Sequence, residues 1–430
     1  MKDQLQIEDI PISEIIPYEN NPRIHNKKQI ALLEQSITEF SFTNPVLIDE
    51  NGELLAGHGR LLAAKKLGLK SVPSIRITHL SAEQKRAYRI ADNQLTIRGE
   101  WDSDLLGIEF KELSDLEFDL SVTGFEPSEI DLTIEGLDTE EGDDEANDLP
   151  EVGKDTPIAQ PGDLWQLGRH FIYCGDATHP SSYETLLQDR QAHMIFTDAP
   201  YNVSIKKHVC GLGKIQHQEF AMATGEMTQA EFTDFLEKVF GLLKKHSING
   251  SLHYLCMDWR HIQEITRACE GVYEEFKNMC VWNKNNAGMG SMYRSKHELV
   301  FVYKNGKEPH LNNIELGKHG RYRTNVWDYD GVNSFSRKGE LELHPTVKPI
   351  DLVADAILDC TKRNYVVLDS FLGSGSTLIA CERTGRICYG IELEPRYIDV
   401  TIQRWQKYTN QEAIHHLTGQ TYNERKQENE

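Results

Sequence analysis

A short polar segment, Asp198-Ala199-Pro200-Tyr201, follows an apolar run and combines residues suited to act on a flat ring that bears an amino group. Asp198 can accept one N–H of an exocyclic amine, a main-chain carbonyl can accept the other, and Tyr201 can stack on the ring. Hydrogen bonds from both amine hydrogens push electron density onto the nitrogen, which can then attack an electrophilic carbon. The alternative for such a segment standing alone is an ordinary turn at the end of a strand.

A second segment offers a place for the ligand that would carry that carbon. The apolar run 366–369 leads into Phe371-Leu372-Gly373-Ser374-Gly375 and then into a helical pattern. Glycines let the backbone approach a ligand closely, and a helix N-terminus favours polar or anionic groups. Glu392 ends the next apolar run, where its carboxylate can accept hydrogen bonds from two ribose hydroxyls.

Two known types of ligand-binding loop fit these glycines less well. A dinucleotide-binding loop has a third small residue where this chain has Leu378, and a phosphate-binding P-loop has a lysine that this loop lacks. The loop therefore fits a nucleoside without a pyrophosphate better than either. An ordinary strand-to-helix turn would explain the glycines but not Glu392.

Both segments lie in a region, from about residue 161 onward, where strand-like and helix-like stretches alternate. Short apolar runs at 192–197, 365–369 and 387–392 predict strands, and the pattern at 229–245 predicts a helix between strands. This alternation predicts an α/β fold with a mainly parallel sheet. The chemistry outlined above requires the strand ends at Asp198 and at the Gly373 turn to lie side by side.

The acidic charge of the chain is concentrated in one stretch. The net charge is −21, yet residues 102–155 contain twenty Asp and Glu against Lys111 and Lys154, which is −18. The rest of the chain is therefore close to neutral, at about −3, and the overall charge does not exclude a polyanionic partner.

The cysteine pattern and the hydropathy restrict the class of protein. None of the eight cysteines precedes Cys174 and no pair forms a CxxC, so neither a disulfide framework nor a zinc ribbon is expected and no metal is assigned. No apolar run is long enough to span a bilayer, and the first residues lack a signal-peptide core. The sequence predicts a cytoplasmic protein that does not enter membranes.

The two motifs together resemble the amino-methyltransferases of DNA that use S-adenosyl-L-methionine. Asp198 to Tyr201 is similar to the D-P-P-Y motif of that family, and Phe371 to Gly375 is similar to its F-x-G-x-G motif. Further similar segments are distributed over nearly the whole range 161–410: Gly162–Trp165, Tyr173–Ala177, Val281–Lys284, His297–Val300 and His344–Pro349. Because the catalytic motif precedes the cofactor loop, the chain resembles the permuted β group of the family.

The resemblance implies a fold and a reaction. The fold would be a Rossmann-like α/β methyltransferase domain with circularly permuted motifs, joined to a small α+β N-terminal domain. The reaction would be methyl transfer from S-adenosyl-L-methionine to N6 of a flipped adenine in double-stranded DNA, since Asp at position 198 usually accompanies adenine in the family and Ser accompanies cytosine. The alternatives are N4-cytosine methylation, a ParB-like DNA-binding protein with a degenerate methylase, and an RNA or small-molecule methyltransferase. Such two-part chains resemble prophage-type modification methylases.

The resemblance also assigns roles to individual residues. The catalytic residues would be Asp198, Ala199, Pro200 and Tyr201, and Ala199 replaces a proline that contributes its main-chain carbonyl. The residues expected to bind the cofactor are Asp176, Thr346, Lys348, Asp369, Phe371, Gly373, Gly375, Ser376 and Glu392.

DNA contacts are expected from two further segments. The target-recognition segment would lie near 304–340, whose basic and aromatic residues are Lys318, Arg321, Arg323, Trp327, Tyr329, Arg337 and Lys338. The alternative there is a solvated loop region. The loop Ser204–Met227 would be mobile without DNA and close on the target strand.

The N-terminal region has its own pattern. Asn44–Ile48 and Glu53–Ala56 predict a hairpin around Asn51-Gly52, and 60–67 predicts a helix that ends at Gly68. This part resembles the ParB/sulfiredoxin-like domain, whose G-x-x-R element is similar to Gly57 and Arg60. That resemblance implies a nucleotide or phosphate at the helix N-terminus. The alternative is a domain that only docks DNA or a protein, with Arg60 in an ion pair.

The predicted organisation has four parts. A ParB-like domain would span 1–99, an acidic and partly disordered connecting segment 100–160, the methyltransferase domain 161–420, and a polar tail 421–430. The partners considered are double-stranded DNA, a second copy of the chain in a homodimer and a nucleotide at the ParB-like domain.

Overall fold

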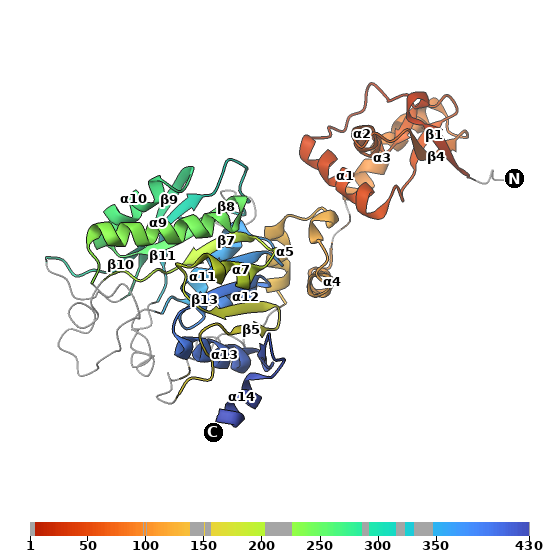
Figure 1. The fold of residues 1–430 in the computed structure, drawn as a ribbon. Helices are drawn as coiled ribbons and strands as arrows, with labels where there is room; N and C mark the ends of the chain where they lie inside the picture. The colour runs from red at the N-terminus through yellow and green to blue at the C-terminus, as the bar shows by residue number, and fades with distance from the viewer. Residues whose placement is uncertain are drawn as a thin grey trace. The chain divides into compact units, whose positions relative to one another are not determined.

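The computed structural model describes residues 5–97, 99, 101–137, 150, 156–202, 226–285, 292–314, 323–330 and 347–429. The chain divides into two compact units, Met1–Leu137 and Asp138–Glu430. Figure 1 labels many of the helices and strands of both units. The first unit extends beyond residue 99, where the sequence suggested a boundary.

The first unit is built on a four-stranded sheet in the order β1-β4-β2-β3. These strands are β1 (Ile7–Pro11), β2 (Val46–Asp49), β3 (Leu54–Ala56) and β4 (Ser71–Ile77). Three helices accompany the sheet, α1 (Lys27–Phe40), α2 (His58–Lys66) and α3 (Ala82–Ile97). The β2–β3 hairpin and α2 confirm the hairpin and helix expected from the sequence.

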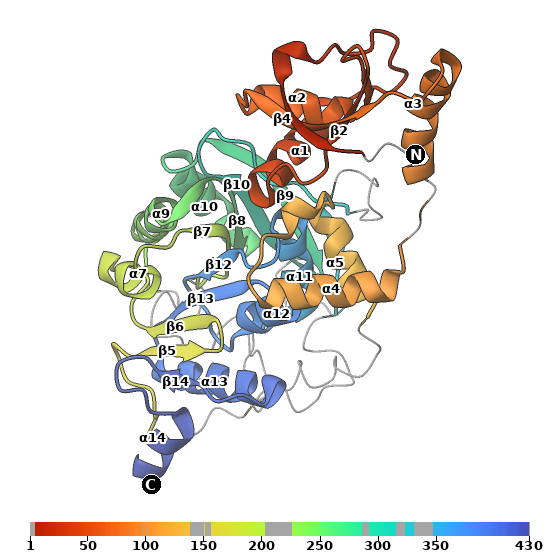
Figure 2. The same ribbon diagram turned by 90° about the vertical axis from the view of Figure 1, so that its right-hand side faces the viewer.

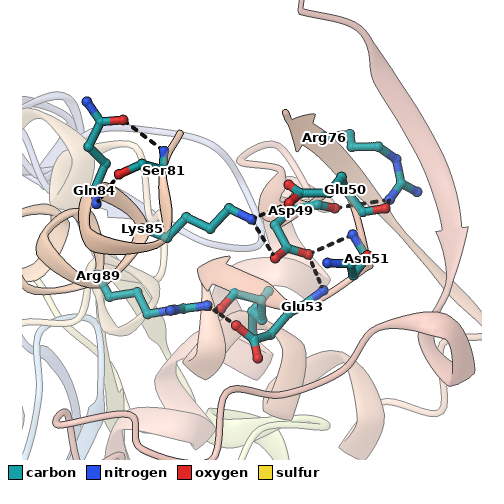
Figure 3. A network of polar contacts seen from close by, with 10 residues as sticks. Asp49, Glu50, Asn51, Glu53, Arg76, Ser81, Gln84, Lys85 and Arg89 are labelled. Carbon is teal, nitrogen blue, oxygen red and sulfur yellow. Dashed lines mark hydrogen bonds and ion pairs between the residues drawn. The ribbon is translucent and has the colours of Figure 1, made fainter. Parts of the chain in front are cut away.

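Helix α3 is fastened to the turn between β2 and β3 by charged groups (Figure 3). Lys85 Nζ lies 3.0 Å from Asp49 Oδ2 and 2.6 Å from Glu50 Oε1, and Arg89 pairs with Glu53. Asp49 also accepts the N–H groups of Asn51 and Glu53, each at 2.9 Å. The buried Asp49 thus closes the turn and holds the helix at the same time.

Residues expected to be a connecting segment include two helices and a short 3-10 turn. They are α4 (Ser103–Asp115), η2 (Leu120–Thr123) and α5 (Pro127–Glu135), packed around a small apolar cluster of Phe110, Leu120, Ile130 and Ile134. Asp102 caps α4 by accepting from the N–H groups of residues 104 and 105. The high acidic content concealed this apolar pattern. Residues 138–149, where the acidic run is densest, lie outside the described residues.

The second unit contains a ten-stranded sheet in the order β11-β9-β10-β8-β7-β12-β13-β6-β5-β14. Its strands are β5 (Leu164–Leu167), β6 (His170–Cys174), β7 (Ala192–Thr197), β8 (Ser247–Met257), β9 (Glu275–Asn283), β10 (His297–Lys304), β11 (Val326–Asp328), β12 (Val366–Asp369), β13 (Ile387–Glu392) and β14 (Ile414–His415). The central run β8-β7-β12-β13-β6 is parallel, as the sequence predicted.

Helices cover both faces of this sheet (Figure 2). A separate apolar core lies on each face. One core includes residues of α11 (Ile350–Cys360), α12 (Ser376–Thr384) and α13 (Pro395–Thr409). The other includes residues of α7 (Pro180–Leu187), α9 (Gln229–Lys245) and α10 (Ile262–Glu270). Because both faces are covered, most residues of the parallel strands are buried.

The end of the chain is anchored to the second unit. Residues expected to form a polar tail make helix α14 (Tyr422–Asn429). Tyr422 is 2% exposed and accepts a hydrogen bond from Gln403, while Arg425 lies 3.2 Å from Asp163. The one aromatic residue of this stretch gives it a buried attachment that its polar composition hides. Among the described residues, no helix is long and apolar enough to cross a membrane.

Candidate active site

Four parallel strands of the second unit end at one edge of the sheet and carry the candidate residues there. Asp198 follows β7, Ser370 follows β12, Glu392 ends β13, and Gly175 follows β6. The strands are consecutive neighbours in the order β7-β12-β13-β6. The carboxyl edge of a parallel sheet is where ligands bind in open α/β folds.

The ends of β7 and β12 are joined directly by side chains. Thr197 Oγ1 donates to Asp369 Oδ1 at 3.2 Å and lies 3.1 Å from Ser370 Oγ. Asp369 also accepts from Thr377 Oγ1 at 2.7 Å and from the Phe371 N–H at 3.0 Å. Burial raises the pKa of Asp369 to about 6. Its carboxyl group therefore braces the loop from inside, and its contact with the cofactor, which the resemblance implies, stays a prediction.

The glycine loop is shaped for a close approach to a ligand. Gly373 has φ +55°, and a Cβ added there would meet no heavy atom within 4 Å. Gly375 has φ +82° and caps α12, and a Cβ there would lie 2.8 Å from Thr401 Cγ2. A side chain at either position would be strained. At the same helix N-terminus, the buried Ser376 Oγ has no hydrogen-bond partner within the described residues.

Glu392 links the glycine loop to the neighbouring strands. Its Oε2 accepts the Gly373 N–H at 2.8 Å and its Oε1 accepts the Glu394 N–H at 2.9 Å. Burial raises the pKa of Glu392 to about 7. The main-chain carbonyl of Glu392 accepts the N–H of Gly175. The next residue, Asp176, is partly exposed, and its side chain accepts the Thr178 N–H at 2.7 Å.

These features fit a nucleoside cofactor. The position next to Gly373 is open, the Ser376 hydroxyl has no hydrogen-bond partner in the described part of the chain, and two carboxylates lie on adjacent strands at the same edge. Phe371 packs against the core on the α9 side, with its ring 6.1 Å from that of Phe235.

Asp198 is held by two protein groups at once. Lys348 Nζ lies 2.5 Å from Oδ2, and the Tyr201 hydroxyl donates to Oδ1 at 2.5 Å. Burial raises the pKa of Asp198, although the ammonium of Lys348 opposes this shift. Ala199 stands between Asp198 and Pro200 in the chain, and its side chain is buried in the core. It therefore offers the site only its backbone.

Glu298, the second residue of β10, completes this cluster. Its Oε2 lies 3.0 Å from Lys348 Nζ and accepts from the Tyr201 hydroxyl at 3.3 Å, while Lys284 pairs with its Oε1. Burial alone would raise the pKa of Glu298, but the attraction of Lys348 and Lys284 lowers it to about 2. Burial alone would lower the pKa of Lys348, but Asp198 and Glu298 raise it.

The placement of Lys348 differs from the sequence expectation, which assigned it to the cofactor. Its ammonium lies in the Asp198 cluster, 5.4 Å from the centre of the Tyr201 ring and 5.9 Å from that of Trp282. Thr346, the other residue assigned from the same motif, lies outside the described residues. In the sequence, Glu298 and Lys284 stand out only as parts of similar segments, because a lone acid in a strand gives no sign of the partners that it meets across the sheet.

Some residues expected to contact DNA instead hold the second unit together. Arg323 Nη1 lies 2.8 Å from Asp355 Oδ2 and its Nε lies 3.0 Å from Asp359 Oδ2. Arg323 also donates to the Tyr329 hydroxyl at 2.6 Å, and Trp327 is 5% exposed. Lys318, Arg321, Arg337 and Lys338 lie outside the described residues, as does loop 204–225.

In the first unit, the G-x-x-R element lies at the start of α2. Gly57 caps the helix with φ +95°, and Arg60 Nη2 donates to the Pro45 carbonyl at 3.3 Å. The buried atoms Arg60 Nε and His58 Nε2 have no hydrogen-bond partner within the described residues. Burial lowers the pKa of Arg60, and Asp92 opposes this shift.

Comparison with known proteins identifies the second unit. Residues 192–403 match the family model for N6/N4 methyltransferases, described as DNA methylase. This region is a DNA methylase domain. In the first unit and beyond it, residues 1–94 match the ParB N-terminal domain, and residues 104–161 match the helix-turn-helix domain of ParB-methyltransferases. Family membership indicates S-adenosyl-L-methionine as the cofactor of the methylase domain.

Individual relatives match each part of the chain. The ParB-like nuclease domain-containing protein YnaK of Escherichia coli K12 is 49% identical over 86 residues, which are 20% of this chain and 99% of that protein. The type II methyltransferase M2.LlaDCHI of Lactococcus lactis is 26% identical over 261 residues, which are 53% of this chain and 88% of that protein. The PvuII cytosine-N4 DNA methyltransferase structure has a TM-score of 0.43 at 15% identity, over 60% of this chain and 94% of that chain.

Proposed function

We propose that this DNA methyltransferase methylates the exocyclic N6 of adenine in double-stranded DNA. The observation that carries the proposal is the arrangement of Asp198 and Tyr201 at the end of β7, on the strand next to the glycine loop of β12. This arrangement supports the proposal, because a hydrogen-bond acceptor for an amine and a ring for stacking would lie beside a loop that fits a nucleoside. Asp at position 198, rather than Ser, favours adenine over cytosine as the target.

The cofactor-side residues each have a stated task in this proposal. Glu392 would accept hydrogen bonds from the ribose hydroxyls of the cofactor, and Asp176 would lie near the adenine of the cofactor. The N–H groups at the start of α12 and the Ser376 hydroxyl would bind the remaining polar groups of the cofactor. When bound, S-adenosyl-L-methionine supplies a methyl group on a positively charged sulfur.

The target base has to leave the duplex before its amine can reach the site. Extrusion of a base costs about a few kcal/mol, and stacking on Tyr201 would offset about 1–3 kcal/mol of that cost. Asp198 would then accept one amine hydrogen and the Ala199 carbonyl the other. Both bonds direct the nitrogen lone pair at the methyl carbon, so the protein accelerates the reaction mainly by positioning.

The proton balance needs no strong base. The nitrogen gains a methyl group while the carbon–sulfur bond breaks with its electron pair going to sulfur. The nitrogen is then positively charged and readily loses a proton to Asp198 or to water. Asp198, which pairs with Lys348 in the structure, needs only weak basicity for this role.

Nucleoside mass spectrometry and single-molecule sequencing of DNA from cells expressing the chain test this function. We expect N6-methyladenine at one recurring sequence, and far less of it in cells that express the Asp198→Ala variant. N4-methylcytosine instead would overturn the choice of adenine. Unmodified DNA from the wild-type chain, with the cofactor bound in vitro, would overturn DNA methylation itself.

We also propose that the ParB-like domain binds a nucleoside triphosphate at the N-terminus of α2. The buried Arg60 Nε and His58 Nε2, which lack partners within the described residues, support this proposal because a phosphate could accept from both. Calorimetric titration with CTP and ATP, with Arg60→Ala as the control variant, tests it. Equal binding by both proteins, or none by the wild-type chain, would overturn it.

A further inference from the structure

Both carboxylate oxygens of Asp198 are occupied by protein groups. One accepts the Tyr201 hydroxyl and the other lies 2.5 Å from the ammonium of Lys348. The function proposed above requires Asp198 to accept a hydrogen from the target amine. A charge-assisted bond from an ammonium is roughly twice as strong as one from a neutral amine. The amine therefore cannot displace Lys348 unless the ammonium gains something elsewhere.

Glu298 is the group that can receive this ammonium. Its Oε2 already lies 3.0 Å from Lys348 Nζ, and its side chain is nearly as buried as that of Lys348. Lys348 lies beside both carboxylates and can shift its bond from Asp198 to Glu298 without leaving the cluster. The rings of Tyr201 and Trp282 lie near the ammonium and favour its remaining within the cluster during this shift.

The charges of the cluster remain matched throughout such a shift. Asp198 and Glu298 contribute two negative charges, and Lys348 and Lys284 contribute two positive charges. Without Glu298, releasing Asp198 would leave a buried ammonium without a counter-charge, which is strongly unfavourable. Lys284 is more exposed and holds the opposite oxygen of Glu298, so this carboxylate stays oriented toward Lys348.

We propose that Lys348 stands in for the target amine at Asp198, and that Glu298 is the positioning residue that takes over Lys348 when the base enters. The inference rests on the proposed function and extends it with a residue and a lysine movement at the same site. Glu298 does not touch the reacting atoms, because it acts through Lys348 and Tyr201.

The test compares two DNA duplexes that carry the target sequence found by sequencing. One has adenine at the target position, and the other has purine, which lacks the amino group. Binding is measured with S-adenosylhomocysteine present, so that no methyl transfer occurs. Only the adenine duplex brings an amine that must displace Lys348 from Asp198.

The central variant is Glu298→Gln, which keeps the shape and removes the charge. We expect its dissociation constant for the adenine duplex to rise about tenfold or more, the loss of one bond to a charged group, while that for the purine duplex changes less than about twofold. Glu275→Gln is the matched control, because that carboxylate pairs with Lys277 of its own strand β9 and with Lys304 of the neighbouring β10, away from the cluster. We expect Glu275→Gln to leave both constants unchanged.

A second variant gives the opposite sign and keeps the proposal testable if Glu298→Gln folds poorly. Lys348→Met removes the competitor, so it should strengthen binding of the adenine duplex relative to the purine duplex. Cofactor binding, measured separately, should persist in both variants and report a folded domain.

Three results would overturn the inference. They are equal weakening of both duplexes by Glu298→Gln, no weakening of either, and weaker binding of adenine relative to purine in Lys348→Met. If the wild-type chain methylates adenine and one of these results appears, the inference alone fails. A wild-type chain that leaves adenine unmethylated overturns the proposed function and this inference with it.

Discussion

Thr197 and Asp369 join the ends of two neighbouring strands through a buried hydrogen bond of 3.2 Å. Thr197 directly precedes the Asp198 turn, and Asp369 braces the glycine loop through Thr377 and Phe371. The segment that would hold the target amine and the segment that would hold the methyl donor are therefore positioned by one shared contact. The distance between these two segments is determined by the pairing of β7 with β12.

Removing the hydroxyl of Thr197 should loosen this contact. We expect Thr197→Val to lower the free energy of unfolding by about 1–3 kcal/mol, because one oxygen of a buried carboxyl group loses a partner. Denaturant unfolding measures the change. Thr266→Val is the control, since that hydroxyl donates to the carbonyl of Ile262 in its own helix on the surface. Equal effects of the two substitutions would contradict the joining role of Thr197.

The Asp198→Ala variant separates catalysis from cofactor binding. We expect methyl transfer to fall by about a hundredfold to a thousandfold, the usual scale for removing a group that directs the reacting centre. Binding of S-adenosyl-L-methionine should persist, because the cofactor-side residues lie on the other strands. Calorimetry and a radiolabel transfer assay measure the two quantities. Loss of cofactor binding would place Asp198 in the wrong role.

The Ala199→Pro variant tests the departure from the D-P-P-Y motif. Alanine still supplies a main-chain carbonyl, and a proline would mainly restrict φ. We expect methyl transfer to continue and stability to change by about 1 kcal/mol or less. Because Ala199 is 2% exposed, a thermal unfolding curve should accompany the assay. A folded but inactive variant would contradict the role given to this carbonyl.

The pH dependence of cofactor binding follows from Glu392. Burial raises its pKa to about 7, so its ionised form, which accepts ribose hydroxyls best, becomes populated as the pH rises through that value. We expect affinity to increase by up to about tenfold per pH unit below pH 7 and then to level off. Calorimetry across this range measures it. The Glu392→Gln variant is the control. Any pH dependence that comes from titration of the cofactor itself should remain in this variant, and the part that comes from Glu392 should be lost.

The same shift has the opposite effect on the stability of the cofactor-free protein. The raised pKa values of Glu392 and Asp369 mean that the folded state binds more protons than the unfolded state between about pH 4.5 and 7. The contribution of these groups to the free energy of unfolding should therefore decrease as the pH rises through this window. Denaturant unfolding of the wild-type chain and Glu392→Gln across the window checks the sign.

Substitution of Arg323 tests whether this residue acts in structure or in DNA contact. We expect Arg323→Met to lower the free energy of unfolding by about 3–5 kcal/mol, because it removes the guanidinium that pairs with the buried Asp359. Arg260→Met, at a surface pair with Asp258, is the control and should change stability by less than about 1 kcal/mol. An Arg323 variant of normal stability with weakened DNA binding would support the sequence expectation instead.

Local patterns predicted what local chemistry determines. The strands before Asp198 and Gly373, the hairpin around Gly52 and helix α2 each carry their own signal in turn residues and apolar spacing. The position of Lys348 could not be read in this way, because its partners Asp198 and Glu298 are distant in sequence and meet only when β10 and β7 share a sheet with β8. Tyr422 and the apolar cluster of α4 and α5 were hidden by surrounding polar residues.

The two short strands at the edges of the ten-stranded sheet affect how the protein behaves in concentrated solution. Within the described residues, β14 has two residues and β11 has three, so each edge offers few unpaired backbone groups to another chain. Truncation before Ile414 would remove β14 and uncover β5 along its hydrogen-bonding side. Such a truncated protein should aggregate more readily, even though every catalytic residue is retained.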